Sequence, residues 1–206
     1  WASAACIDDM QNTLGNVFDR FDAHVSNINE NLSGPKLNRY DVVFVSANAN
    51  LSGSDVDLLS RLVQRGSNVV LKNLTPENVS RFKALLPENI QMEPSETFQI
   101  GSRTFPISPY LIPVSNEKED YHPLVCGLTS DDFFWSEAGR LKEGDGTPQI
   151  TRYLPSFSGR KEGIYFTTQP AALVVLPIGA GQVVIDQIQW EEGIQYMPDR
   201  LQRLVS

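Results

Sequence analysis

The sequence is poor in the residues that most often carry metal, redox or nucleophilic chemistry. It has two cysteines and two histidines among 206 residues. Cys6 and Cys126 are too few for a disulfide framework and lack the spacing of metal ligands, so we expect two buried free thiols and no metal site. No cofactor is expected either. The glycines of Gly179-Ala-Gly181 join two predicted strands, whereas a dinucleotide fingerprint must open a helix.

Positive charge and long apolar runs are also scarce. The formal net charge is -8 and no Lys/Arg cluster offsets it, which argues against nucleic acid or an anionic membrane as a partner. No apolar run approaches the ~20 residues of a membrane helix, so membrane insertion is not expected. Because the chain begins at Trp1 rather than Met, we expect a processed protein or a piece of a longer one.

Four Asn-x-Ser/Thr triplets begin at Asn31, Asn50, Asn73 and Asn78. They match the glycosylation sequon of exported proteins. Such triplets also arise by chance in a chain rich in Asn and Ser, so they add only a little to the expectation of a periplasmic, extracellular or cell-surface protein.

The chain is organised around a βαβ unit between Leu37 and Leu74. Asp41–Val45 is a short apolar, β-branched run of the kind that lies covered on both faces of a parallel sheet. A polar loop follows, and Ser54 is the expected N-cap of an amphipathic helix that ends at Gly66. Ser67–Leu74 returns as the next strand through a right-handed crossover.

The same patterns extend the prediction to an α/β domain covering residues 1–206, with an irregular, β-rich excursion at about 89–170. Short or apolar runs predict strands at Trp1–Ile7, His24–Ile28, Ile90–Glu93, Thr97–Ile100, Thr104–Ile107, Ile150–Leu154, Ala171–Pro177 and Gln182–Ile188. Helical spacing predicts helices at Met10–Phe21, from Thr75 to Pro87, and at Met197–Val205. The last two strands form a tight antiparallel hairpin.

This order of elements resembles the class I glutamine amidotransferase-like fold, a flavodoxin-like, three-layer and mostly parallel sheet with a C-terminal antiparallel hairpin. More narrowly, it resembles the non-catalytic version attached to β-galactosidases and other secreted glycoside hydrolases and found in gliding-motility and intraflagellar-transport proteins. Three passages carry the resemblance: Tyr40-Asp-Val-Val-Phe-Val with its helix and the strand Asn68-Val-Val-Leu, the turn His122-Pro-Leu-Val-Cys-Gly-Leu128, and the hairpin Pro177-Ile-Gly-Ala-Gly-Gln-Val-Val-Ile185.

The resemblance implies a catalytic triad at two places, and the sequence lacks it at both. An amidotransferase places a cysteine on the strained turn after a central strand, here Lys72-Asn-Leu-Thr-Pro76, and this turn contains no cysteine. The C-terminal segment that would carry the histidine and glutamate reads Gln187-Ile-Gln-Trp-Glu191, with no histidine. The sequence therefore favours a domain that is not an enzyme by itself.

An alternative is a sugar-related enzyme of the same fold that uses His122 as a base with Asp132 or Glu191. The competing interpretation is that His122-Pro123 shapes a turn and that the acids are solvated loop charges, the usual state of such residues. A general base also needs an orienting partner, which a sequence does not reveal.

Five residues are candidates for ligand contact. Trp190 follows a predicted strand at its carboxyl end, where open α/β sheets bind ligands, and Asp8, Asn48 and Asn50 are expected along the same edge. Trp135 lies in the most aromatic segment and could stack on a sugar ring, although core packing is the commoner role of aromatic residues.

The sequence thus predicts a non-catalytic, amidotransferase-like accessory domain of a larger, exported glycoside hydrolase-type protein. Its expected partners are other domains or subunits of that protein, and carbohydrate. Interaction, oligomerisation and carbohydrate contact stay open as its role.

Overall fold

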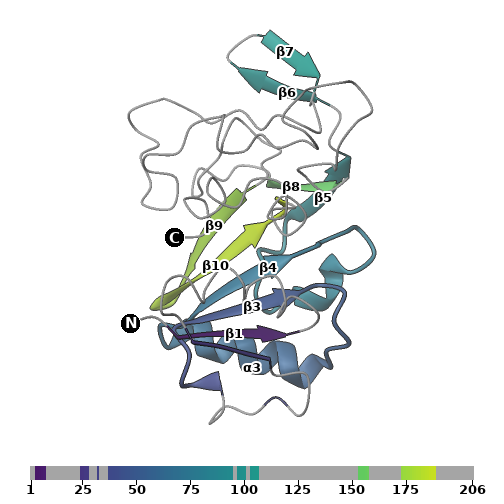
Figure 1. Ribbon diagram of the computed structural model, residues 1–206. Helices are drawn as coiled ribbons and strands as arrows, with labels where there is room; N and C mark the ends of the chain where they lie inside the picture. Colours follow the sequence, from purple (N-terminus) through teal and green to yellow (C-terminus); the bar gives the residue numbers. More distant parts are fainter. Residues whose placement is uncertain are drawn as a thin grey trace, which may run out of the picture.

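The chain forms an α/β structure around a six-stranded, mostly parallel sheet (Figure 1). The computed structural model describes residues 3–7, 24–27, 32, 37–94, 97–100, 103–106, 153–157 and 173–188. Across the sheet the strands lie in the order β2 (His24–Asn27), β1 (Ser3–Ile7), β3 (Val42–Ser46), β4 (Asn68–Lys72), β10 (Gly181–Asp186) and β9 (Leu173–Ile178). The six strands predicted for this sheet are confirmed, each to within two residues at either end.

Parallel pairing joins β2, β1, β3, β4 and β10, and β9 returns antiparallel to β10. The hairpin predicted at the C-terminal end is therefore confirmed. Its turn is Gly179-Ala180, which connects two strands and opens no helix. This agrees with the expectation that these glycines form no dinucleotide loop.

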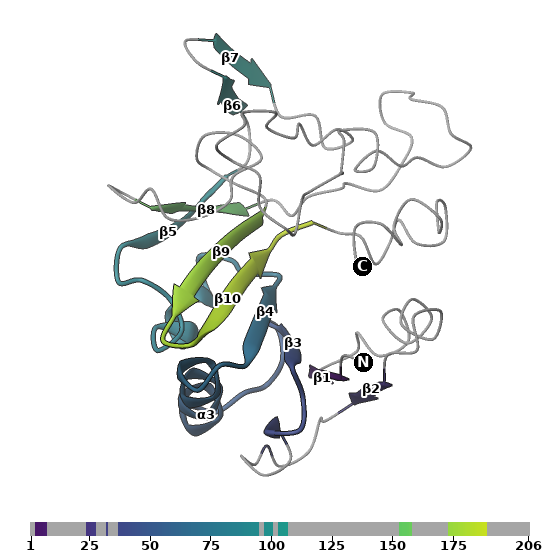
Figure 2. The same cartoon turned by 90° about the vertical axis from the view of Figure 1, so that its left-hand side faces the viewer.

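One helix, α3 (Gly53–Gln64), connects β3 to β4 and packs against β4 and β10 (Figures 1 and 2). Its N-cap is Ser52, which corrects the prediction of Ser54. Ser52 rather than Ser54 caps the helix because Asp55 lies three residues after Ser52. The Ser52 hydroxyl accepts from the Asp55 N–H and the Asp55 carboxylate accepts from the Ser52 N–H, so a reciprocal capping box forms. The helix ends before Gly66, which has φ +115°, as predicted.

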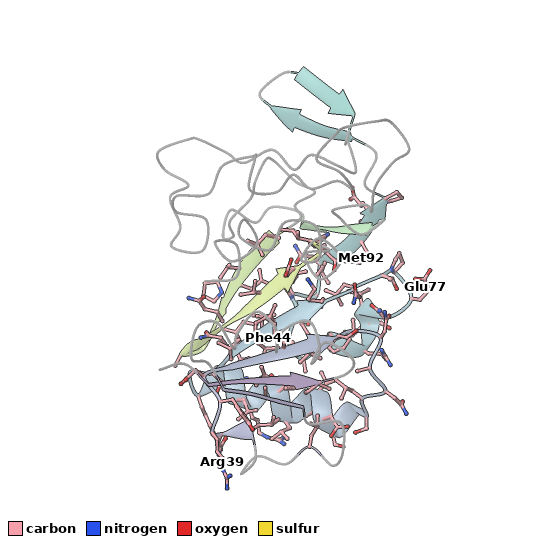
Figure 3. All side chains as sticks on the ribbon, viewed as in Figure 1. Arg39, Phe44, Glu77 and Met92 are labelled. Carbon is pink, nitrogen blue, oxygen red and sulfur yellow. The ribbon has the colours of Figure 1, made fainter. Side chains whose placement is uncertain are left out.

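Burial alternates along the central strands β3 and β4. On the face toward α3, Val43 and Val45 of β3 and Val69 and Leu71 of β4 are fully buried. Alternate residues point to the opposite face, where Phe44 and Val70 are half-buried neighbours in register (Figure 3). The described core lies between α3 and the central strands and continues over β9 and β10, where residues on both faces of the sheet are buried.

The helix predicted from Thr75 to Pro87 is wrong in type. The segment forms turns around one short 3₁₀-helix, η2 (Val79–Phe82). The Arg81 N–H bonds to the Asn78 carbonyl and the Leu85 N–H to the Phe82 carbonyl, each three residues back, because Asn78, Val79 and Ser80 are weak helix formers that do not sustain an α-helix. The predicted apolar stripe is still buried at Phe82, Leu85 and Leu86, and Val79 is half-buried.

Two antiparallel pairs lie beyond the main sheet. β5 (Ile90–Pro94) pairs with β8 (Tyr153–Phe157), and β6 (Thr97–Ile100) forms a hairpin with β7 (Arg103–Pro106), at the top of Figure 1. β5, β6 and β7 lie within one residue of the predicted strands at either end, and β8 lies three residues later than predicted. Most of the predicted excursion at 89–170 lies outside the described residues.

The predicted helices Met10–Phe21 and Met197–Val205 lie outside the described residues. Among the residues that the structure describes, no helix is both long and apolar enough to span a bilayer.

The hairpin turn and the end of α3 approach each other closely. A Cβ on Gly179 would lie 2.7 Å from the Gln64 Cα, and one on Gly181 would lie 2.1 Å from the Ser67 carbonyl oxygen. The Ala180 N–H donates to the Gln64 carbonyl (3.3 Å). The glycines are needed for this contact because no side chain fits between the two backbones.

Candidate functional site

The strand order places a topological switch point between β1 and β3. From β1 the chain proceeds outward to β2, and from β3 it proceeds outward in the opposite direction to β4. Open α/β sheets bind ligands at the carboxyl ends of the strands beside such a point. In Figure 3, Glu77 marks the carboxyl edge of the sheet and Arg39, which precedes β3, marks the amino edge.

The loop after β3 presents two amides at this edge on a fixed backbone. Its residues alternate: Ala47 and Ala49 are buried, whereas Asn48 and Asn50 are exposed. The Ala47 N–H donates to the Lys72 carbonyl (2.8 Å) and the Ala49 N–H to the Ser46 carbonyl (3.0 Å). The buried alanines and these bonds hold the loop, so both asparagine side chains start from a defined position.

The turn after β4 carries the only non-glycine residue with a positive φ among the described residues, Asn73, at +58°. Asn is one of the few residue types that enter this region readily. The Asn78 amide supports the turn, because its Nδ2 donates to the Asn73 carbonyl (3.0 Å) and its Oδ1 accepts from the Thr75 N–H (2.8 Å). A strained residue directly after a central strand is the backbone feature of a nucleophile elbow.

Gln187, which follows β10, hydrogen-bonds to the turn after β4. Its side chain is fully buried, its Oε1 accepts from the Leu74 N–H (3.0 Å), and its Nε2 donates to the Leu74 carbonyl (2.8 Å). In a nucleophile elbow, the N–H of the residue after the nucleophile helps to form the oxyanion hole. If Asn73 occupies the nucleophile position, the corresponding N–H is that of Leu74, and it is already bonded.

A buried ion pair lies beside the same turn. Lys72 ends β4 and Asp186 ends β10, directly opposite in register, and their charged atoms are 3.0 Å apart. Lys72 is 1% exposed, and its Nζ also donates to the Ile188 carbonyl (2.6 Å). Asp186 accepts from the Ile188 N–H through its other oxygen (2.9 Å). These bonds compensate for the desolvation of both charges and fix the end of β10 to the end of β4.

The amino end of α3 lies at the same edge of the sheet, and the Asp55 carboxylate caps it. Asp55 accepts from the Ser52 N–H (2.9 Å) and from the Ser52 hydroxyl (2.6 Å). Helix N-termini attract anions because their N–H groups are unpaired and the helix dipole is positive there. Here the side chains of Ser52 and Asp55 supply the acceptor and the negative charge at the amino end of α3.

A loose amide contact connects the two loops. Asn78 Nδ2 lies 3.4 Å from Asn48 Oδ1, longer than most N–H···O hydrogen bonds. The Arg81 guanidinium donates to the Ala47 carbonyl and lies over the Phe82 ring. These contacts connect η2 to the loop after β3. Among the described residues no cluster of three or more metal-ligating side chains occurs.

Of the predicted site residues, the structure places Asn48 and Asn50 on one loop at the carboxyl edge. Six others lie outside the described residues: His122, Asp132, Glu191, Trp190, Trp135 and Asp8. Cys126 is also outside them, and Cys6 lies in β1. β10, the strand before Trp190, is two strands from β3, or about 10 Å at the usual strand spacing.

Sequence reasoning missed Asn78 and Gln187. The Thr75-Pro-Glu-Asn78 spacing is a capping-box pattern and could have indicated that Asn78 bonds back to Thr75. No local pattern indicates that Gln187 reaches Leu74, because 113 positions separate the two residues.

No protein-family model matches the sequence, and no curated protein matches it. Solved structures do resemble the fold. The N-terminal domain of mmIFT52 has a TM-score of 0.54 at 10% identity over 99% of this chain and 93% of that one. A cytoplasmic protein from Salmonella typhimurium has a TM-score of 0.53 at 12% identity, covering 100% of this chain and 98% of that one.

A cold-adapted β-galactosidase from Rahnella sp. R3 also resembles the chain, with a TM-score of 0.51 at 13% identity. The match covers 99% of this chain but 30% of that enzyme, so the chain corresponds to a part of the β-galactosidase. Identities this low show a shared fold and leave the activity open.

Proposed function

We propose that the chain is a non-catalytic, amidotransferase-like accessory domain of a larger, exported glycoside hydrolase-type protein. The observation that carries the proposal is the turn after β4. It has the backbone of a nucleophile elbow, but its strained residue is Asn73, whose amide is no nucleophile. The N–H that would stabilise an oxyanion is bonded to Gln187.

The strand order supports the fold assignment within this proposal. The run β2-β1-β3-β4-β10 has the 2-1-3-4-5 order of flavodoxin-like sheets, and β9 adds an antiparallel hairpin strand at the edge. The likeness to about a third of a β-galactosidase supports a role as one domain among several. In that role the domain contributes contacts with neighbouring domains, with other subunits or with carbohydrate, while another domain performs hydrolysis.

The purified 206-residue chain tests the non-catalytic claim directly. We expect no release of ammonia from glutamine and no cleavage of aryl β-galactosides or β-mannosides above the buffer rate. Turnover of either substrate class that co-purifies with the folded chain would overturn the proposal. Mass-spectrometric identification of the protein in the preparation excludes a contaminating hydrolase.

The variant Asn73→Cys separates two reasons for inactivity. Cysteine at this position restores a nucleophile in the turn, but the Leu74 N–H stays bonded to Gln187 and the turn still lacks a histidine. We therefore expect Asn73→Cys to remain inactive toward glutamine. Glutaminase activity in this single variant would mean that the rest of the catalytic apparatus is intact, which contradicts an accessory role.

The accessory role is tested in the longer protein that the proposal implies. Deleting residues 1–206 from it should leave kcat on a small aryl glycoside within a few-fold of the parent value. The same deletion should change the oligomeric state, measured by light scattering, or weaken binding to polymeric substrate. Loss of kcat with an unchanged fold of the remaining protein would instead place catalytic residues in this chain.

A further inference from the structure

We propose that the turn after β4 is a binding site for a primary carboxamide, which the chain fills with the side chain of its own Gln187. Truncation of Gln187 empties this site and lets it take small uncharged amides in preference to carboxylates or ketones of the same size. The geometry that points to it is the paired contact of the Gln187 amide with the backbone of Leu74. The inference goes beyond the accessory role and does not depend on it.

The paired contact identifies the chemical class of the ligand. The Gln187 Oε1 accepts from the Leu74 N–H (3.0 Å), and its Nε2 donates to the Leu74 carbonyl (2.8 Å). A ligand that satisfies both groups must present an acceptor and a donor on atoms attached to one carbon. A primary carboxamide does so without charge, whereas a carboxylate has no donor and a ketone has only an acceptor.

Burial makes this pairing selective. Leu74 and Gln187 are both fully buried, so the contact is made away from bulk solvent. A buried backbone carbonyl that is left without a donor is costly, which penalises a carboxylate or a ketone at this place. The charges of Lys72 and Asp186, which lie in the same region, already pair with each other at 3.0 Å. A carboxylate therefore gains no net attraction from them.

The Leu74 side of the site is held independently of Gln187. The Asn78 amide bonds the residues on either side of Leu74, because its Nδ2 donates to the Asn73 carbonyl (3.0 Å) and its Oδ1 accepts from the Thr75 N–H (2.8 Å). We therefore expect the Leu74 N–H and carbonyl to keep their places when the Gln187 side chain is shortened. A site that does not collapse after truncation leaves a cavity.

The backbone around Gln187 is held as well. Asp186 pairs with Lys72 across β10 and β4, which lie side by side in Figures 1 and 2. The Lys72 Nζ donates to the Ile188 carbonyl (2.6 Å), and the Ile188 N–H donates to the Asp186 Oδ1 (2.9 Å). Both neighbours of Gln187 are thus fixed without the help of its side chain.

Thermal unfolding of Gln187→Ala provides the test. The substitution removes a CH₂–CONH₂ group, which acetamide matches in size and in hydrogen-bonding atoms. Acetamide, acetone and sodium acetate are each titrated to about 0.2 M at matched ionic strength, because so small a ligand binds weakly. We expect acetamide to raise the unfolding temperature of Gln187→Ala by about 2–4 °C relative to its effect on the parent chain. Acetone and acetate should give no such rise.

Gln187→Met is the matched control, because methionine occupies a similar volume without making either hydrogen bond. Its unfolding temperature should respond to acetamide as that of the parent chain does. An equal rise in Gln187→Met would place the binding elsewhere and overturn the inference. The absence of a rise in Gln187→Ala, or an equal rise with all three compounds, would also overturn it, because the emptied turn would then have no preference for an amide.

The Leu74 N–H reports on the site itself. In ¹⁵N-labelled Gln187→Ala, acetamide should shift the Leu74 backbone signal saturably and slow its hydrogen exchange. A rise in unfolding temperature without a change at Leu74 would contradict the inference. If Gln187→Ala does not fold in buffer, it is diluted from urea into each compound. Recovery of folded protein in acetamide alone then supports the inference, and equal failure in all three overturns it.

Discussion

At the scale of single residues, the polar groups beside β4 hold the turn that follows this strand. Lys72, Asp186, Gln187 and Asn78 each bond backbone or charge around the turn after β4. Removing one partner from a buried set of this kind costs more than the bond is worth, because the other partner is left without water or a replacement.

Gln187→Ala tests this structural role. The substitution leaves both the N–H and the carbonyl of Leu74 unpaired in a buried turn. We expect the free energy of unfolding to fall by about 2–4 kcal/mol, measured by urea denaturation. Gln91→Ala, at an exposed position of β5, is the control and should change it by no more than about 0.5 kcal/mol. A cost for Gln187→Ala no larger than that of the control would mean that the turn stands without Gln187.

At the scale of elements, the strands and the end of α3 were predictable, whereas the N-cap of α3 and the type of the segment after β4 were not. Short apolar, β-branched runs such as Val42–Ser46 and Leu173–Ile178 carry their own signal. The N-cap of α3 depended on which serine has an acid three residues later, and Asp55 selects Ser52. The apolar stripe after β4 was correct as burial, but stripe positions do not distinguish an α-helix from turns that bury the same side chains.

Some residues of the candidate site were predictable from the sequence and others were not. Asn48 and Asn50 could be placed at the carboxyl edge because they directly follow a recognisable strand. The bond between Gln187 and Leu74 could not be predicted, since it depends on β10 lying next to β4, and sequence patterns do not encode the neighbour of a strand that comes more than a hundred residues later.

The capping box of α3 gives an element-scale prediction. Ser52→Ala removes the acceptor for the Asp55 N–H and the donor to its carboxylate, so we expect a loss of about 1 kcal/mol in the free energy of unfolding. Ser54→Ala is the matched control, because Ser54 bonds only the Ser52 hydroxyl (2.8 Å), and it should cost less than half as much. Thermal unfolding followed by circular dichroism measures both. A larger cost for Ser54→Ala would restore Ser54 as the cap.

At the scale of the whole molecule, the hairpin β9–β10 closes the sheet onto the helix that precedes β4. Gly179 and Gly181 allow the hairpin turn to lie against the end of α3, and β10 pairs with β4 in the same region. One close backbone contact therefore joins the hairpin turn to the end of α3, more than a hundred residues earlier in the chain.

Gly181→Ala tests that contact. The new methyl group would meet the Ser67 and Val63 carbonyl oxygens, which are backbone atoms and cannot rotate away. We expect a loss of about 3 kcal/mol or more in the free energy of unfolding by urea. Gly53→Ala is the control, because nothing lies within 4 Å of its Cβ position at the start of α3, and stability there should stay the same or rise by up to ~1 kcal/mol. Equal stability of the two variants would exclude the close approach.

The pairing of β10 with β4 also determines when the protein can fold during its own synthesis. Until residues 181–186 leave the ribosome, β4 has no neighbour on that side of the described sheet, and the Leu74 turn lacks Gln187. An unpaired apolar strand edge invites association with other chains. The edge of β4 in the described sheet therefore stays unpaired through the synthesis of more than a hundred residues, and the turn after β4 is completed only when Gln187 has been made.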